Sequence, residues 1–191
     1  MRGVPWWAML SSALAPVLLI GGWTLAAARQ GPAFSSVRDT ISALAGRAAT
    51  DRWLMTAALF GLGLCHLVTA AGLRPAAPVG RLVLAVGGLA TLAVATFPVP
   101  AVGTSAAHLA AAWVAFAALA VWPAFAWRSG TGAAALRPGF ALVGAALLVG
   151  LALWLAVALF TDPQRLGLAE RCAAGAQAVW PLVVVVSVAA A

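Results

Sequence analysis

Six apolar segments, each long enough to cross a membrane, constrain this chain more than any other feature of its sequence. A bilayer core of about 30 Å requires roughly 20 apolar residues in a helix. Breaks rich in Gly and Pro separate the segments, as expected for turns between helices. The expected spans are residues 8–28, 51–72, 80–97, 105–127, 137–160 and 169–190. The sequence therefore predicts an all-α fold, a six-helix transmembrane bundle that residues 1–191 form as a single integral membrane domain.

The composition excludes a soluble globular domain. Hydrophobic residues make up 64% of the 191 residues, charged residues make up 8%, and the mean hydropathy is +1.05. A soluble domain has about 25% charged residues, because water must wet its surface. The net charge of +7 would suggest nucleic acid in a soluble protein, but here the Arg residues stand singly between apolar spans. We expect membrane lipid as a partner and no nucleic acid.

The distribution of charge predicts an orientation. Two connections and their flanks carry basic residues and no acid, namely Arg74, Arg81, Arg128 and Arg137. All four acids of the chain lie in the other connections, namely Asp39, Asp51, Asp162 and Glu170. Short, purely basic connections belong in the cytoplasm. All 11 basic residues are Arg, which is typical of a high-GC bacterial genome. We therefore expect a bacterial cytoplasmic membrane protein whose N- and C-termini are both cytoplasmic.

Several motifs with polar residues occur once each along the chain, in a particular order and spacing. Residues 38–45 read Arg-Asp-Thr-Ile-Ser-Ala-Leu-Ala and lead into 51–55, Asp-Arg-Trp-Leu-Met. Phe97-Pro98 is followed by His108, and residues 167–171 are followed by Trp180-Pro181. Over nearly the whole chain this pattern resembles an uncharacterised prokaryotic membrane family catalogued as domain of unknown function 998. The resemblance implies a helical membrane bundle of similar layout and implies no activity.

The connection between the first two spans has a helical period. Phe34, Val37, Ile41, Leu44 and Ala48 fall on one face of a helix over residues 34–48, and polar residues fall on the others. This pattern predicts a short amphipathic helix in the outer headgroup layer or a re-entrant cap over the mouth of the bundle.

The second, fourth and sixth spans all begin on the acid-bearing side, where their N-termini favour negative charge. We expect a polar site there in which His108 acts as a base, with Asp39 and Glu170 as acid or orienting groups. The residues expected to bind an anionic headgroup are Ser36, Arg38, Asp51, Asp162 and Arg171. A purely structural alternative stays open: residues 36–39 fit a capping box, and Ser105 can cap the helix that contains His108.

The function predicted from these residues is a non-enzymatic membrane module. It would bind a lipid headgroup, a small amphiphile or a membrane partner at the extracytoplasmic face. The sequence does not identify its protein partners. The alternative is a membrane enzyme acting on a lipid or isoprenoid-like substrate at the outer leaflet, and a small transporter comes third. No phosphate-binding loop, metalloprotease motif or haem-attachment motif is present, so we expect no cofactor and no metal. His66 lies deep in the second span, where we expect it to face the bundle interior and hydrogen-bond a neighbour.

Overall fold

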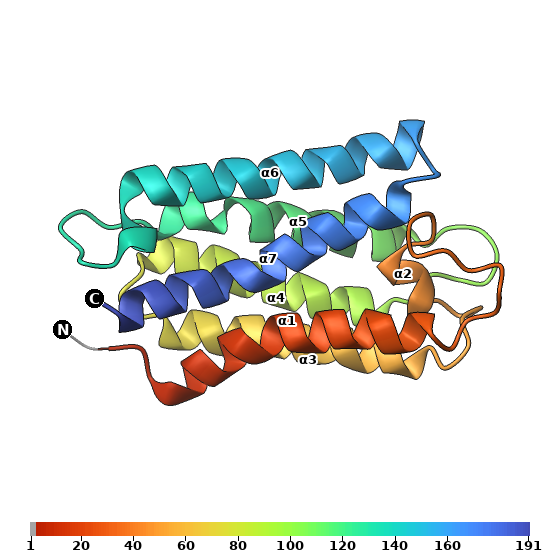
Figure 1. The fold of residues 1–191 in the computed structure, drawn as a ribbon, viewed down its shortest axis with the longest axis horizontal. Helices are drawn as coiled ribbons and strands as arrows, with labels where there is room; N and C mark the ends of the chain where they lie inside the picture. The colour runs from red at the N-terminus through yellow and green to blue at the C-terminus, as the bar shows by residue number, and fades with distance from the viewer. Residues whose placement is uncertain (1–2) are drawn as a thin grey trace.

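The computed structural model describes residues 3–191, so the first two residues of the expected domain lie outside the described residues. The described chain is helical and contains no strand (Figure 1). Its long helices are α1 (Trp6–Ala27), α3 (Trp53–Gly72), α4 (Pro78–Thr96), α5 (Ala106–Ala126), α6 (Pro138–Thr161) and α7 (Leu166–Ala189). A short helix, α2 (Ile41–Leu44), lies between α1 and α3, and one 3₁₀ turn, η1 (Ala134–Leu136), precedes α6.

The six long helices are long and apolar enough to cross a membrane, which confirms the predicted six-span bundle. Their ends lie within a few residues of the expected ones. α4 begins at Pro78. Pro is well suited to the first turn of a helix, because the N–H that it lacks would have no partner within the helix at that position. α7 begins at Leu166 rather than at residue 169, because the Arg165 N–H already closes a turn onto the Asp162 carbonyl.

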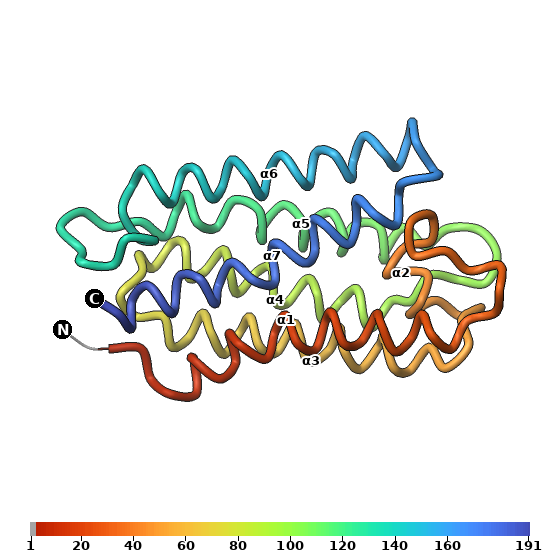
Figure 2. The backbone as a smooth tube through the Cα atoms, in the orientation of Figure 1, coloured from red at the N-terminus to blue at the C-terminus, as the bar shows by residue number. Residues whose placement is uncertain are grey.

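The spanning helices form a closed ring. Each packs against the next spanning helix along the chain, and α7 completes the ring by packing against α1 (Figure 2). Consecutive spanning helices run antiparallel, and the connection from α1 to α3, which contains α2, is the longest (Figure 1). α6 is the least embedded member, since 22% of its span is buried against 33% to 50% of the others. The ring therefore has one loosely covered helix, α6, between α5 and α7.

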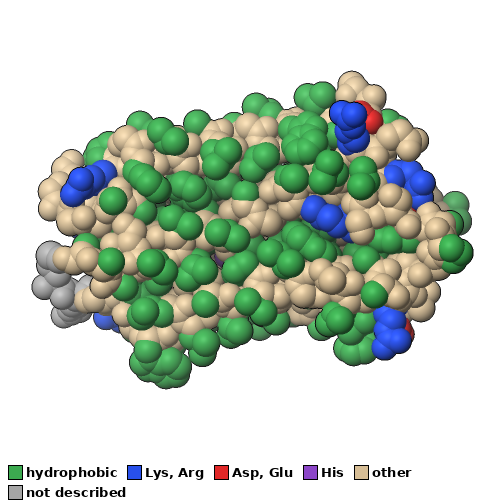
Figure 3. All heavy atoms as spheres, viewed as in Figure 1, with side chains coloured by type: hydrophobic (Ala, Val, Ile, Leu, Met, Phe, Trp, Pro, Cys, Tyr) green, Lys and Arg blue, Asp and Glu red, His purple; other side chains and the backbone are tan. Residues whose placement is uncertain are grey.

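Close contacts between small residues hold the ring together, as is usual where lipid offers no hydrophobic driving force between helices. A side chain at Gly80 would overlap the backbone of Ala126, so α4 and α5 approach as closely as they do only with glycine at this position. A buried hydrogen bond of 2.8 Å joins the Ser11 and Thr69 hydroxyls between α1 and α3. Hydrophobic side chains cover the middle of the bundle surface in view, and charged side chains lie mostly toward its ends (Figure 3).

The predicted short helix is present, but it is only the four residues of α2. Thr40 caps it, since its side-chain oxygen accepts a hydrogen bond of 2.9 Å from the Ala43 N–H. Ile41 and Leu44 are buried and belong to the same core cluster as residues of α1 and α3. α2 is therefore folded over the end of the bundle at which α3, α5 and α7 begin, called the capped end below (Figure 1).

Candidate functional site

The segment before α2 is held against the start of α7 by backbone hydrogen bonds. The Gly167 N–H donates to the Arg38 carbonyl at 3.2 Å, and the Leu168 N–H donates to the Val37 carbonyl at 2.9 Å. The first N–H groups of any helix lack partners within that helix. Here a loop more than a hundred residues earlier in the sequence satisfies them. Gly167 is required at this contact, because a Cβ there would overlap the Asp39 carbonyl.

Arg171 fastens the same loop from one turn further along α7. Its Nη1 donates to the carbonyls of Ser36 and Asp39, each at 2.7 Å, and to that of Gly167 at 3.0 Å. Carbonyl oxygens and not carboxylates are the acceptors. Arg171 therefore serves to hold the connection between the first two spans against the last span.

Glu170 ties α2 to α7 in a second way. Its carboxylate accepts hydrogen bonds from the Ile41 N–H and from the Ser42 hydroxyl, the latter at 2.9 Å. The side chain is buried, with the residue 6% exposed. In the sequence Glu170 falls near the expected start of its own helix, where a negative charge is favourable. Instead its carboxylate satisfies the first N–H of α2, because loop carbonyls already satisfy the start of α7.

Asp39 stabilises the loop locally. Its Oδ2 accepts from the Ser35 N–H at 2.7 Å and from Arg38 Nη2 at 3.0 Å, so it closes a turn on Ser35 rather than on Ser36. Partial burial opposes the charged form. The hydrogen bonds from Ser35 and Arg38 and the charges of Arg38 and Arg171 outweigh it, and the pKa of Asp39 lies below its ordinary value.

His108 lies one turn inside α5, where Ser105 caps the helix by accepting from the His108 N–H at 3.2 Å. Its Nδ1 is 2.8 Å from the Phe97 carbonyl oxygen. A carbonyl can only accept, so we assign the proton of the neutral ring to Nδ1, which leaves Nε2 with a free lone pair. Phe97 thus orients the imidazole, a role that the sequence suggested for a carboxylate.

A pocket of about 490 Å³ lies between α5 and α6 and is called the lateral pocket below. Its walls are apolar side chains of the two helices, among them Trp113, Phe116, Val121, Val149 and Leu153. At the capped end the lining becomes polar and consists of Thr40, Ser42, His108 and Glu170. Several wall residues are exposed on the outside of the bundle, including Trp113 at 42% and Leu153 at 60%. The pocket therefore opens sideways, toward the surface that faces lipid.

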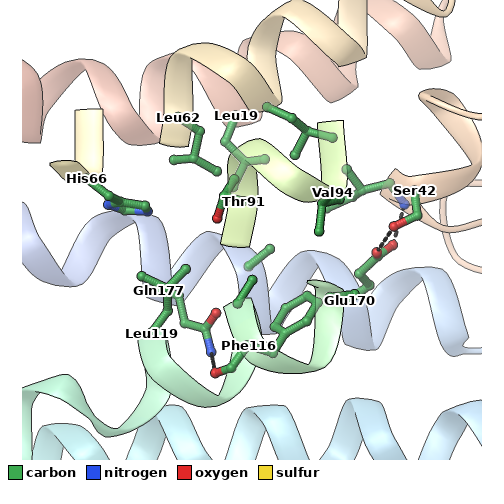
Figure 4. A pocket seen from close by; sticks show the side chains of 15 residues that line it. Leu19, Ser42, Leu62, His66, Thr91, Val94, Phe116, Leu119, Glu170 and Gln177 are labelled. Carbon is green, nitrogen blue, oxygen red and sulfur yellow. Dashed lines mark hydrogen bonds between the residues drawn. The ribbon is translucent and has the colours of Figure 1, made fainter. Parts of the chain in front are cut away.

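A second, smaller cavity of about 50 Å³ lies inside the ring and is called the interior cavity below (Figure 4). His66 and Gln177 line its deep part, and Ser42 and Glu170 line its other end. His66 is 1% exposed and faces the interior as expected, but neither ring nitrogen has a hydrogen-bond partner among residues 3–191. Two polar groups of the same cavity bond elsewhere, since Gln177 Nε2 donates to the Phe116 carbonyl and the Thr91 hydroxyl donates to the Gly87 carbonyl of its own helix.

The structure brings some predicted site residues together and separates others. His108 and Glu170 line the same pocket, without a hydrogen bond between them. Ser36, Arg38 and Asp39 lie in the loop held on α7, Arg171 lies on α7 itself, and none of the four lines the lateral pocket. Asp51 and Asp162 lie near the surface, 3.7 Å from Arg29 and 3.9 Å from Arg165. Within residues 3–191 no three His, Cys, Asp or Glu side chains are grouped as a metal site would require.

The site residues Thr40, Ser42 and Phe97 were not predicted from the sequence. Ser42 contacts Glu170 across 128 residues, Phe97 contacts His108 across the connection between α4 and α5, and Thr40 lines the pocket beside α5 and α6. The recurrence of small residues on facing stretches of α5 and α6 was the one available sign of the lateral pocket, and such residues more often indicate close helix packing.

Residues 13–187 match a family described as "Protein of unknown function (DUF998)". This match covers nearly the whole chain and agrees with the resemblance read from its motifs. Neither the curated proteins nor the solved structures contain a match to the chain.

Proposed function

The chain belongs to the DUF998 family, and we propose that this multi-pass membrane protein is a non-enzymatic module that binds a small amphiphile in its lateral pocket. The single observation that carries the proposal is the division of that pocket into a long apolar trough and a polar end. Ligand pockets of about 300–1,000 Å³ with mostly apolar walls and a few polar groups are typical of small-molecule sites. A volume of about 490 Å³ lies inside that range.

The dimensions fit one alkyl chain. On α5 the lining extends from His108 to Val121, which corresponds to about 20 Å along a helix that rises 1.5 Å per residue. The sideways opening gives an amphiphile access from the bilayer without leaving the apolar phase. Its chain would lie along α5 and α6, and its head would reach His108 and Glu170.

A blocking substitution tests the proposal. Ala152→Trp on α6 places an indole in the trough, and Val143→Trp is a matched control on the same helix, because Val143 is 71% exposed and does not line the pocket. Both proteins are purified in mild detergent, and native mass spectrometry identifies the lipids that remain bound. We expect a stoichiometric amphiphile on the wild type and on Val143→Trp, and its loss from Ala152→Trp. Equal retention by both variants would contradict the proposal.

We further propose that the capped end is extracytoplasmic, with the termini in the cytoplasm. The distribution of charge supports this orientation: Arg74, Arg128 and Arg137 lie in connections at the other end, without an acid among them. Ala48→Cys at the capped end and Ser129→Cys at the other end, both at exposed positions, test it with a membrane-impermeant thiol reagent on intact cells. We expect labelling of Ala48→Cys only. Labelling of Ser129→Cys alone would reverse the orientation.

The place of His108 supports a second candidate, a membrane enzyme that acts on a lipid or isoprenoid-like substrate. Nε2 of His108 has a free lone pair beside the pocket and is thus able to accept a proton. Incubation with lipid extracts, followed by mass spectrometry of the lipids, tests this alternative. Conversion that disappears in His108→Ala would support it, whereas unchanged lipids favour the binding module.

A further inference from the structure

The polar end of the lateral pocket offers mainly hydrogen-bond acceptors. His108 donates through Nδ1 to the Phe97 carbonyl, so its Nε2 can only accept while the ring is neutral. The Ser42 hydroxyl donates its proton to Glu170, so its oxygen is left as an acceptor. Both groups line the pocket.

Glu170 and Thr40 complete the set. Each oxygen of the Glu170 carboxylate accepts one hydrogen bond from the α2 region, and an ionised carboxylate has about four lone-pair sites, so acceptor capacity remains. Thr40 uses its side-chain oxygen to accept from the Ala43 N–H, which leaves its hydroxyl proton as the one free donor among these groups.

No positive charge faces this end of the pocket among the residues that line it. The guanidinium adjacent in sequence, that of Arg171, donates through Nη1 to the carbonyls of Ser36, Asp39 and Gly167. Its Nε and Nη2 are buried without a hydrogen-bond partner, and Arg171 does not line the pocket. Arg38 is likewise engaged, with Asp39 and with the Ala33 carbonyl. A phosphate or carboxylate head placed here would meet a carboxylate and lone pairs, without a cation among the lining residues to pair with it.

We infer that the amphiphile bound in the lateral pocket carries an uncharged or cationic head that donates hydrogen bonds, a hydroxyl or a primary ammonium, and not an anionic head. This inference rests on the proposed function and names the chemical class of its ligand. It also differs from the sequence-based expectation of an anionic headgroup, because Arg38 pairs with Asp39, Arg171 Nη1 donates to backbone carbonyls, and neither Arg lines the pocket.

A series of ligands with one chain and four heads tests the inference. The probe is a tetradecyl alcohol with a photoreactive diazirine in its chain, and the competitors are tetradecanol, tetradecylamine, tetradecyl methyl ether and tetradecyl phosphate. Labelled peptides of α5 and α6 are quantified by mass spectrometry in the wild type, with Ala152→Trp as the blocked reference. We expect the alcohol and the amine to compete about tenfold better than the ether or the phosphate, since one hydrogen bond to a buried group is worth about one factor of ten.

His108→Ala provides the matched variant. It removes the acceptor Nε2, so we expect the alcohol to lose its advantage while the ether, which cannot donate, competes as it does in the wild type. The unchanged ether affinity shows that the pocket is still folded. Two outcomes would overturn the inference and leave the proposed function standing. One is that the phosphate competes as well as the alcohol or better, and the other is that the ether and the alcohol compete equally. Labelling that Ala152→Trp does not reduce, for any head, would overturn the proposed function itself.

Discussion

The Ser42 hydroxyl donates a hydrogen bond of 2.9 Å to the Glu170 carboxylate across 128 residues of sequence. This bond, with that from the Ile41 N–H to the same carboxylate, joins the connection between the first two spans to the last span. Both residues also line the lateral pocket and the interior cavity. The contact that holds α2 in place is therefore also part of the wall of each cavity.

Removal of the Glu170 carboxylate should loosen α2. In Glu170→Ala the Ile41 N–H and the Ser42 hydroxyl lose their buried acceptor, and we expect a loss of about 2–4 kcal/mol of stability. Thermal unfolding in detergent measures the loss, and faster proteolysis within residues 35–50 locates it. Asp51→Asn is the control, because Asp51 is half-exposed, its ion pair with Arg29 is worth at most about 1 kcal/mol, and Asn tolerates its positive φ. Equal unfolding temperatures for the two variants would rule out this role of Glu170.

Gly167→Ala should disturb the docking of the loop on α7. Its Cβ would overlap the Asp39 carbonyl, which is backbone and cannot turn away as a side chain can. We expect a loss of about 1–3 kcal/mol in thermal unfolding, typical of overpacking. Gly150→Ala on α6 is the matched control, since a Cβ there meets nothing within 4 Å. The structure is contradicted at this point if Gly167→Ala unfolds at the temperature of Gly150→Ala or above it.

Acid should weaken the loop through Asp39. Because its folded-state pKa lies below the ordinary value of 3.8, Asp39 contributes stability at pH values above the ordinary pKa, and that contribution disappears as the pH falls through the lower folded-state value. Asp39→Asn should therefore unfold at a lower temperature than the wild type at pH 6, and the difference should shrink below about pH 4. Unfolding temperatures of the two proteins from pH 3 to pH 7 check this. A difference that stays constant with pH would show that the carboxylate charge contributes nothing.

The two histidines of the chain should differ in reactivity. His108 lines the open lateral pocket and keeps Nε2 free, whereas His66 is 1% exposed inside the ring. Diethyl pyrocarbonate, which acylates neutral imidazole, should modify His108 well before His66, and peptide mass spectrometry distinguishes the two. Saturation with tetradecanol should protect His108 and leave His66 unchanged. Modification of His66 at the rate of His108 would show that the interior cavity is open to the reagent.

The spans could be predicted because their physical cause is local. Each is a run of apolar residues of membrane length bounded by Gly, Pro or polar residues, and neither its type nor its extent depends on the rest of the chain. The Ser105 cap before His108 was recognisable for the same reason, since it joins residues three apart. The existence of a short helix between the first two spans followed from the periodicity of residues 34–48.

The length and place of that helix could not be predicted from its periodicity. The helix ends at Leu44. Carbonyls of the preceding loop accept hydrogen bonds from N–H groups of α7, and no local sequence pattern specifies this pairing. The lateral pocket depends on the distance between α5 and α6. Small side chains on the two helices are compatible with a short distance and with a long one, so they do not specify it. Arg171 looked like an anion-binding residue because its charge is visible in the sequence, whereas its carbonyl partners are visible only in the fold.

The attachment of the loop to α7 has a consequence for biosynthesis. Ribosomes make a chain from its N-terminus, so residues 36–42 leave the ribosome long before the partners that hold them, which include Gly167 and Glu170. Until the sixth span is inserted, α2 has no acceptor for its first N–H other than water or lipid. The connection between the first two spans therefore docks only after the last span is inserted. In a nascent chain truncated before residue 166, that connection would lack its contacts with α7.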